Sequence, residues 1–195
     1  MTNKVLAETF VGETKNALRL RQAVLVLAGI AILAIAAKIR VPMWPVPITM
    51  GTFAVLALGA AYGPRLGLVT ILGYMGLGAL GLDVFADSAG AATGLTYMLG
   101  GTGGYLVGYV LATVALGLLA RRGWDRSVLW MGLAMLIGNA LIYLPGLAWL
   151  GQLYGWDKPI LAWGLTPFLV GDALKLVLAA MVLPVAWRLV GRARG

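Results

Sequence analysis

Residues 161–189 read LAWGLTPFLVGDALKLVLAAMVLPVAWRL, an apolar run that holds two charges in its interior, Asp172 and Lys175. A helix that crosses a bilayer needs about 20 mainly apolar residues, so this run predicts a membrane-spanning helix. The two charges are three residues apart and therefore share one helix face. Ionisable side chains are costly inside a membrane and usually face a protein interior or a cavity. We expect the pair to form the floor of a ligand site; the alternative is a structural ion pair whose charges only neutralise each other.

The composition of the whole chain is that of a membrane protein. Of its 195 residues 61% are hydrophobic and 11% are charged, whereas about a quarter of the residues in a soluble domain are charged. The chain contains neither Cys nor His, which excludes thiolate nucleophiles, thiolate metal sites and His-based triads. It also lacks the G-x-S-x-G elbow of many hydrolases. We predict an all-α membrane protein with a single integral membrane domain over residues 1–195, which is not an enzyme and needs no cofactor or metal ion.

Five further apolar segments precede residues 161–189, and together they predict a compact bundle of six transmembrane helices over residues 22–190. The second segment is short for a span. Residues 1–21 and 191–195 are predicted to be polar tails. Small residues recur every four positions in the fourth segment (Gly100, Gly104, Gly108 and Ala112), which predicts a smooth stripe against a neighbouring helix. The five segments are residues 22–37, 49–61, 66–80, 102–120 and 128–150.

The lysines and arginines predict the orientation of the bundle, because cytoplasmic loops carry an excess of these residues. With six spans, one side of the membrane receives only Lys38, Arg40 and Lys158. The other side receives eleven, so we predict that both termini are cytoplasmic. The net charge of +8 is then a topology signal that also favours contact with anionic membrane lipid, and no nucleic-acid partner is expected. The eleven are Lys4, Lys15, Arg19, Arg21, Arg65, Arg121, Arg122, Arg126, Arg188, Arg192 and Arg194.

Two connections on the predicted outer side carry polar and aromatic residues. Residues 38–50 contain three prolines, which predicts an ordered extended loop that includes Trp44 and Thr49. Residues 81–101 form a long polar connection with Asp87 and Tyr97, which is typical of a lid or binding loop.

Four polar residues of the last two spans are expected at similar depth beneath these outer connections. At about 1.5 Å per residue, Asp172 lies about 10 Å below the outer surface, and Lys175, Asn139 and Tyr143 lie at a similar depth. We therefore predict a pocket that opens to the outside. Simpler roles remain open for three residues: Asn139 could join two helices, Tyr143 could be packing, and Trp44 could anchor the chain at the interface.

Six stretches of this sequence, which lie in one order over nearly the whole chain, resemble the BioY family of biotin-transporter substrate-binding subunits. They are PMWPVPITMGTF (42–53), GPRLG (63–67), GLDVFA (81–86), GTGGYLVG (101–108), GNALIY (138–143) and PFLVGDALK (167–175).

The resemblance implies the S subunit of an energy-coupling-factor (ECF) transporter, which captures biotin from the outer face. Its implied partners are a transmembrane coupling protein and ABC-type ATPases. This chain has no G-x-x-x-x-G-K-[ST] loop, so ATP hydrolysis is expected from those partners. The ligand site is expected to include Asp172 and Lys175. Chemistry then suggests Lys175 for the biotin carboxylate, and Asp172 and Asn139 for the ureido group.

This chain departs from the family pattern in its second outer connection. Some relatives carry an Arg before the fourth helix, whereas residues 81–103 here contain no basic residue. Lys175 is therefore expected to hold the carboxylate with only uncharged groups to assist it. Two alternative functions stay open at this point: an S subunit for another small carboxylated vitamin, and a solitary ion-coupled carrier.

Overall fold

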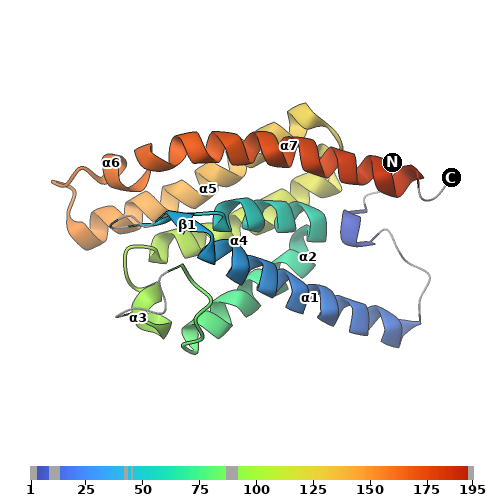
Figure 1. Ribbon diagram of the computed structural model, residues 1–195, viewed down its shortest axis with the longest axis horizontal. Helices are drawn as coiled ribbons and strands as arrows, with labels where there is room; N and C mark the ends of the chain where they lie inside the picture. Colours follow the sequence, from blue (N-terminus) through green and yellow to red (C-terminus); the bar gives the residue numbers. More distant parts are fainter. Residues whose placement is uncertain (1–3, 9–13, 42–43, 45, 87–91, 193–195) are drawn as a thin grey trace.

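The computed structural model describes residues 4–8, 14–41, 44, 46–86 and 92–192, and it shows an elongated helical bundle (Figure 1). Short elements join the long helices at both ends. The elements are η1 (Leu6–Glu8), α1 (Lys15–Lys38), β1 (Arg40–Val41), β2 (Ile48–Thr49), α2 (Gly51–Ala79), α3 (Gly94–Met98), α4 (Gly103–Arg121), η2 (Trp124–Arg126), α5 (Val128–Tyr154), α6 (Ile160–Gly164), η3 (Thr166–Phe168) and α7 (Leu169–Arg192).

Five helical stretches are long and apolar enough to cross a membrane: α1, α2, α4, α5 and Ile160–Leu189, which contains most of α7. The predicted second and third spans are the two halves of α2. Gly63 separates them with φ 77° and ψ 176°, a backbone conformation that a side chain would strain. The chain reverses direction there, as the close approach of its two halves shows: a Cβ on Gly67 would lie only 3.6 Å from the Cα of Gly59. The prediction of an all-α bundle with six membrane segments is thus confirmed.

The first helix begins earlier than its apolar segment. α1 starts at Lys15, whereas the apolar segment was predicted from residue 22. Thr14 accepts a hydrogen bond from the Ala17 N–H at 3.4 Å, in the manner of an N-cap. The polar first turns of α1 therefore extend the helix beyond the predicted apolar segment.

Glycine on α4 brings two helices into backbone contact. α4 packs against α2 on one side and α5 on the other. A Cβ on Gly108 would lie 2.6 Å from the Cα of Ile142 in α5, and one on Gly104 would lie 2.3 Å from the Pro145 carbonyl oxygen. On another part of α4, a Cβ on Gly117 would lie 2.4 Å from the nitrogen of Pro64 at the bend of α2. The predicted small-residue stripe is therefore a helix-packing surface.

The outer connections gather at one end of the bundle, where β1, α3 and α6 lie (Figure 1). The predicted extended loop contains a short antiparallel pair in which Arg40 is opposite Thr49. Lys38, at the end of α1, donates hydrogen bonds to Asp83 Oδ1 at 2.5 Å and to the Phe85 carbonyl oxygen at 2.6 Å. These bonds tie the segment after α2 to the end of α1. η1 and the C-terminal part of α7 lie at the opposite end of the bundle (Figure 1).

Candidate ligand-binding site

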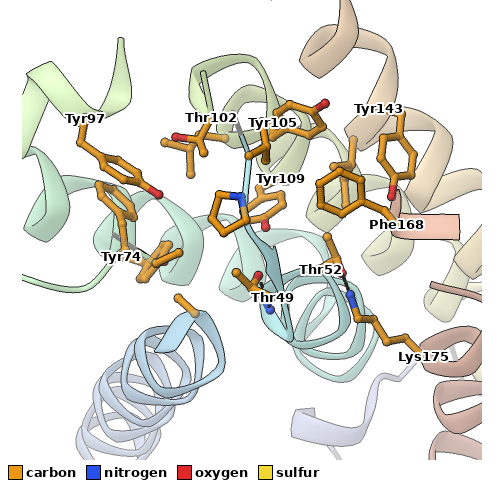
Figure 2. A pocket seen from close by; sticks show the side chains of 18 residues that line it. Thr49, Thr52, Tyr74, Tyr97, Thr102, Tyr105, Tyr109, Tyr143, Phe168 and Lys175 are labelled. Carbon is orange, nitrogen blue, oxygen red and sulfur yellow. Dashed lines mark hydrogen bonds between the residues drawn. The ribbon is translucent and has the colours of Figure 1, made fainter. Parts of the chain in front are cut away.

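A cavity lies among α2, α4, α5 and α7 near the end of the bundle that holds β1 and α3 (Figure 2). The space between its lining atoms is about 620 Å³, part of which is open solvent. This is within the range of about 300–1,000 Å³ that is usual for small-molecule sites. Apolar side chains form much of its wall, and five tyrosines contribute to it: Tyr74, Tyr97, Tyr105, Tyr109 and Tyr143.

The charged pair predicted on the last span lies at one end of this cavity. Asp172 and Lys175 project from the N-terminal part of α7, where the helix dipole favours the negative charge of Asp172. Their side chains are joined by an ion pair of 3.0 Å between Lys175 Nζ and Asp172 Oδ1. Asp172 is only 5% exposed and Lys175 only 8% exposed. Such burial makes the pair costly unless each group is also hydrogen-bonded.

Two hydroxyl groups supply those hydrogen bonds. Lys175 Nζ donates to Thr52 Oγ1 of α2 at 3.0 Å, and the Thr52 hydroxyl lies 3.5 Å from Asp172 Oδ1. Tyr143 of α5 donates its hydroxyl hydrogen to the other carboxylate oxygen, Asp172 Oδ2. The pair therefore connects three helices. Figure 2 shows Thr52, Tyr143 and Lys175 side by side at one end of the cavity.

The charge of this end of the cavity is balanced within the protein. The positive charge of Lys175 is neutralised by Asp172, so the cluster presents hydrogen-bonding groups rather than net charge. A Lys ammonium has three N–H donors, and two of them are used by the described residues. Lys175 also lines the cavity, which leaves its third donor for a ligand acceptor.

Aromatic rings form the other end of the cavity. Phe85 stacks on Tyr97 with ring centroids 5.0 Å apart, and Tyr74 meets Phe85 edge to face at 5.3 Å. The Tyr74 hydroxyl donates to the Val84 carbonyl oxygen at 3.1 Å, which fixes its ring beside this segment. Tyr97 belongs to α3, in the predicted binding loop. An apolar or ring-shaped part of a ligand could pack here.

Arg40 places a positive charge near the same aromatic end. Burial raises the pKa of the Tyr97 hydroxyl, and the charge of Arg40 is among the influences that lower it. Arg40 belongs to β1, and Lys38 lies two residues before it at the end of α1. Lys38 is paired with Asp83. The cavity thus has a neutral donor and acceptor cluster at one end and the charge of Arg40 close to the other.

The structure brings together most, but not all, of the residues predicted for the site. Lys175, Tyr143, Thr49 and Tyr97 line the cavity. Asp172 lies directly behind Lys175 and Tyr143 and is not among the described lining residues.

The other three predicted residues are placed differently. Asn139 is half-buried on α5 and is absent from the described lining. Trp44 is 66% exposed and packs edge to face against Trp163 and Tyr154. Asp87 lies outside the described residues.

Several lining residues were not predicted from the sequence. Thr52 lies in the first turn of α2, three residues after Thr49 at the end of β2. Both belong to the apolar segment predicted over residues 49–61, which was the available signal. Tyr105 and Tyr109 are four residues apart on α4 and therefore share a face. Tyr105 donates its hydroxyl hydrogen to the Gly164 carbonyl oxygen at 2.8 Å. Which helix faces this tyrosine pair depends on long-range packing.

Several known proteins are similar to this chain. The model of the BioY family matches residues 11–192. The probable biotin transporter BioY of Pyrococcus horikoshii is 38% identical over 165 residues, which cover 85% of this chain and 95% of that relative. The biotin transporter BioY of Thermotoga maritima is 34% identical over 160 residues, which cover 81% of this chain and 92% of the relative.

A solved structure shares the fold. The crystal structure of the S-component for biotin from an ECF-type ABC transporter superposes with a TM-score of 0.73. The match covers 91% of this chain and 95% of that chain at 20% sequence identity. The family match spans nearly the whole sequence, and the fold agrees with it. This chain therefore belongs to the BioY family of membrane transport proteins, as its motifs predicted.

Proposed function

We propose that this protein captures biotin from the outer face of the cell membrane and carries it inward as the substrate-binding subunit of an ECF-type transporter. The observation that carries the proposal is the buried cluster of Lys175, Thr52, Tyr143 and Asp172 beside an aromatic cavity. Relatives that carry the name biotin transporter BioY match most of the chain. The cluster offers hydrogen-bond donors and acceptors without net charge, which suits a buried neutral polar group.

The charge balance of the cavity decides which part of biotin faces which end. Biotin has a neutral ureido ring and an anionic carboxylate. Because Asp172 already neutralises Lys175, a carboxylate placed there would leave an excess negative charge in a buried site. The ureido group fits better, since its oxygen accepts from Lys175 and its N–H groups donate to hydroxyl oxygens such as that of Thr52.

This orientation differs from the one suggested by the sequence, in which Lys175 holds the carboxylate. In the proposed orientation the carboxylate lies toward the aromatic end, near the positive charge of Arg40. Arg40 then supplies the basic group that residues 81–103 lack. The valeryl chain of biotin crosses the apolar middle of the cavity beside side chains such as Leu106 and Ile142.

Competition between biotin analogues tests both the ligand and its orientation. We expect purified protein to retain biotin, and biotin methyl ester to bind less than about tenfold more weakly because its carboxyl end lies near the entrance. We expect 2-iminobiotin, in which a guanidine replaces the urea, to bind more than about 100-fold more weakly, because its protonated form has no acceptor oxygen for Lys175. Displacement of labelled biotin by each analogue measures the two effects.

The two analogues also serve as controls for each other. A large loss of affinity for the ester and a small loss for 2-iminobiotin would mean that Lys175 binds the carboxylate. If another carboxylated vitamin displaces the labelled biotin at a lower concentration than unlabelled biotin does, that vitamin would replace biotin as the proposed ligand.

The proposed partners are a transmembrane coupling protein and ABC-type ATPases. The chain contains no phosphate-binding G-x-x-x-x-G-K-[ST] loop of its own, and its fold is that of an S-component. Biotin uptake measured with and without such ATPases distinguishes this assembly from a solitary ion-coupled carrier.

The proposed orientation of the protein in the membrane places both chain ends in the cytoplasm. The excess of Lys and Arg at the end of the bundle that holds η1 supports it. The cavity would then open toward the outside between β1 and α3.

Single introduced cysteines test this membrane orientation directly, because the natural sequence contains no cysteine. In intact cells we expect a membrane-impermeant maleimide to label Lys158→Cys, which lies in the exposed connection before α6. Arg122→Cys, in the exposed connection after α4, should react only after the membrane is permeabilised. The reverse pattern would invert the orientation.

A further inference from the structure

Asp125 is a buried carboxyl group at the end of the bundle opposite the biotin cavity, where the C-terminal part of α7 lies. It belongs to η2, the short turn between α4 and α5, and it is 0% exposed. η2 packs against α4, α5 and α7, so the carboxyl group is shielded from water on all sides. The proposed function makes no use of it.

The two oxygens of this carboxyl group have different surroundings. Oδ2 accepts a hydrogen bond of 2.5 Å from the indole N–H of Trp187 on α7. Oδ1 is also buried, and it has no hydrogen-bond partner among the described residues. A buried charge without full hydrogen bonding costs far more free energy than a buried neutral group that lacks one partner. The geometry therefore disfavours the ionised form of Asp125.

The neighbouring arginine does not form an ion pair with this carboxyl group. Arg126 places its guanidinium over the Trp187 ring, 4.3 Å from the ring centroid, and donates to the Lys4 carbonyl oxygen at 3.2 Å. The cation that follows Asp125 in the sequence is therefore engaged with the indole ring and the backbone. Trp187 contacts both residues of η2, one through its N–H and one through its ring face.

Burial raises the pKa of the Asp125 carboxyl group. The indole N–H of Trp187, the charge of Arg126 and the backbone N–H of Asp125 itself lower this pKa, but burial outweighs them. The first turns of α5 carry no charged residue. The other charged residues on the described elements around η2 are Arg121 and Arg122 at the end of α4, Arg188 on α7, and Lys4 and Glu8 before and in η1.

We propose that Asp125 is a proton-binding site that joins η2 to α7. In the packed form at neutral pH the proton is on Oδ1, because Oδ2 already accepts from Trp187 and an indole N–H can only donate. When η2 separates from α7, Asp125 meets water, ionises and releases this proton to the solvent. A lower pH therefore favours the packed end of the bundle, and a higher pH favours its opening.

Infrared spectroscopy of the purified full chain detects the proton directly, because a protonated carboxyl group has a C=O stretching band that a carboxylate lacks. We expect this band at neutral pH in the natural chain and its loss in Asp125→Asn. Trp187→Phe keeps an aromatic ring but removes the N–H that favours the charged form, so its band should persist to a higher pH than in the natural chain. Equal bands in the natural chain and Asp125→Asn would overturn the proposal, and so would a band that titrates at the same or a lower pH in Trp187→Phe.

Thermal unfolding at several pH values measures the same proton through stability. Because the pKa of Asp125 is raised in the folded state, the folded chain binds this proton more tightly than the unfolded chain does. The protonated group therefore stabilises the fold most at low pH, and this contribution is lost as the pH rises through the folded-state pKa. The unfolding temperature of the natural chain, relative to that of Asp125→Asn, should fall by about 3 °C or more between about pH 4 and about pH 8.

Asp157→Asn is the matched control, because Asp157 is exposed and pairs with Lys158 at the other end of the bundle. It should leave both the infrared band and the pH dependence of unfolding as they are in the natural chain. If Asp125→Asn is less stable than the natural chain by the same amount at every pH, Asp125 is an ionised, hydrogen-bonded carboxylate. That result would overturn the proposal, and neither experiment needs biotin.

Discussion

Lys175→Ala should weaken biotin binding by the purified protein by more than about 100-fold. The change removes the ammonium that lines the cavity and donates to Thr52 and Asp172. Truncating one partner of a buried, hydrogen-bonded charge pair typically costs about 2–5 kcal/mol, because the other charge is left without its partner. Here that charge is the carboxylate of Asp172, which is 5% exposed. Equilibrium binding of labelled biotin to protein of verified folding measures the loss.

Lys158→Ala is the matched control for this prediction. Lys158 precedes α6 at the same end of the bundle, and its ion pair with Asp157 at 2.9 Å is exposed to solvent. Exposed pairs contribute about 0–1 kcal/mol, so biotin affinity should stay within about fivefold. A comparable loss in both variants would mean that a general positive charge, rather than the buried cluster, attracts the ligand.

A second variant separates ligand binding from a purely structural ion pair. Asp172→Asn combined with Lys175→Met removes both charges at nearly constant volume, and such neutral replacements of buried pairs are often tolerated. We expect this protein to fold and to bind no biotin. If it binds biotin as tightly as the natural chain does, the pair only joins α7 to α2 and α5, and the site lies elsewhere in the cavity.

The sequence predicted the bundle and the charged pair because both follow from the free-energy cost of placing each segment's residues in water or in the membrane. An apolar run of 29 residues is expected to form a membrane-spanning helix, and Asp172 and Lys175 within it are expected to face the protein interior. A Gly–Pro step at 63 and 64 breaks a long apolar stretch. Depth along a helix is also local, which is why Tyr143 was expected at the level of Asp172. These inferences need only the rise per residue and the composition of each segment.

Where a cavity ends along a helix depends on neighbours that the sequence does not name. Asn139 and Tyr143 are four residues apart and share one face of α5, yet Tyr143 lines the cavity and Asn139, one turn away, is not among the described lining residues. Thr52, Tyr105 and Tyr109 enter the site because α2 and α4 pack beside α5 and α7. The role expected for Lys175 changed for a related reason. Only the folded structure shows that Asp172 has already balanced its charge.

The second large effect is expected at the glycine contact between α4 and α5. Gly108→Ala should destabilise the protein by about 3 kcal/mol, because the new Cβ would meet backbone that cannot move aside as a side chain can. The Cβ would lie 2.6 Å from the Ile142 Cα, 2.7 Å from the Ile142 carbonyl oxygen and 2.9 Å from the Leu141 carbonyl oxygen. For a chain of this size the apparent unfolding temperature in detergent should fall by about 10 °C.

Gly76→Ala provides the control, since a Cβ at this exposed position of α2 has nothing within 4 Å. Alanine favours a helix over glycine by up to about 1 kcal/mol, so this variant should unfold at the same temperature or slightly higher. Equal unfolding temperatures for Gly108→Ala and the natural chain would mean that α4 and α5 can separate at little cost.

The contact between α4 and α5 also connects stability to biotin binding. Ile142 lines the cavity and precedes Tyr143, which holds Asp172. Displacement of α5 at Ile142 should therefore weaken biotin binding even in the fraction of Gly108→Ala that stays folded.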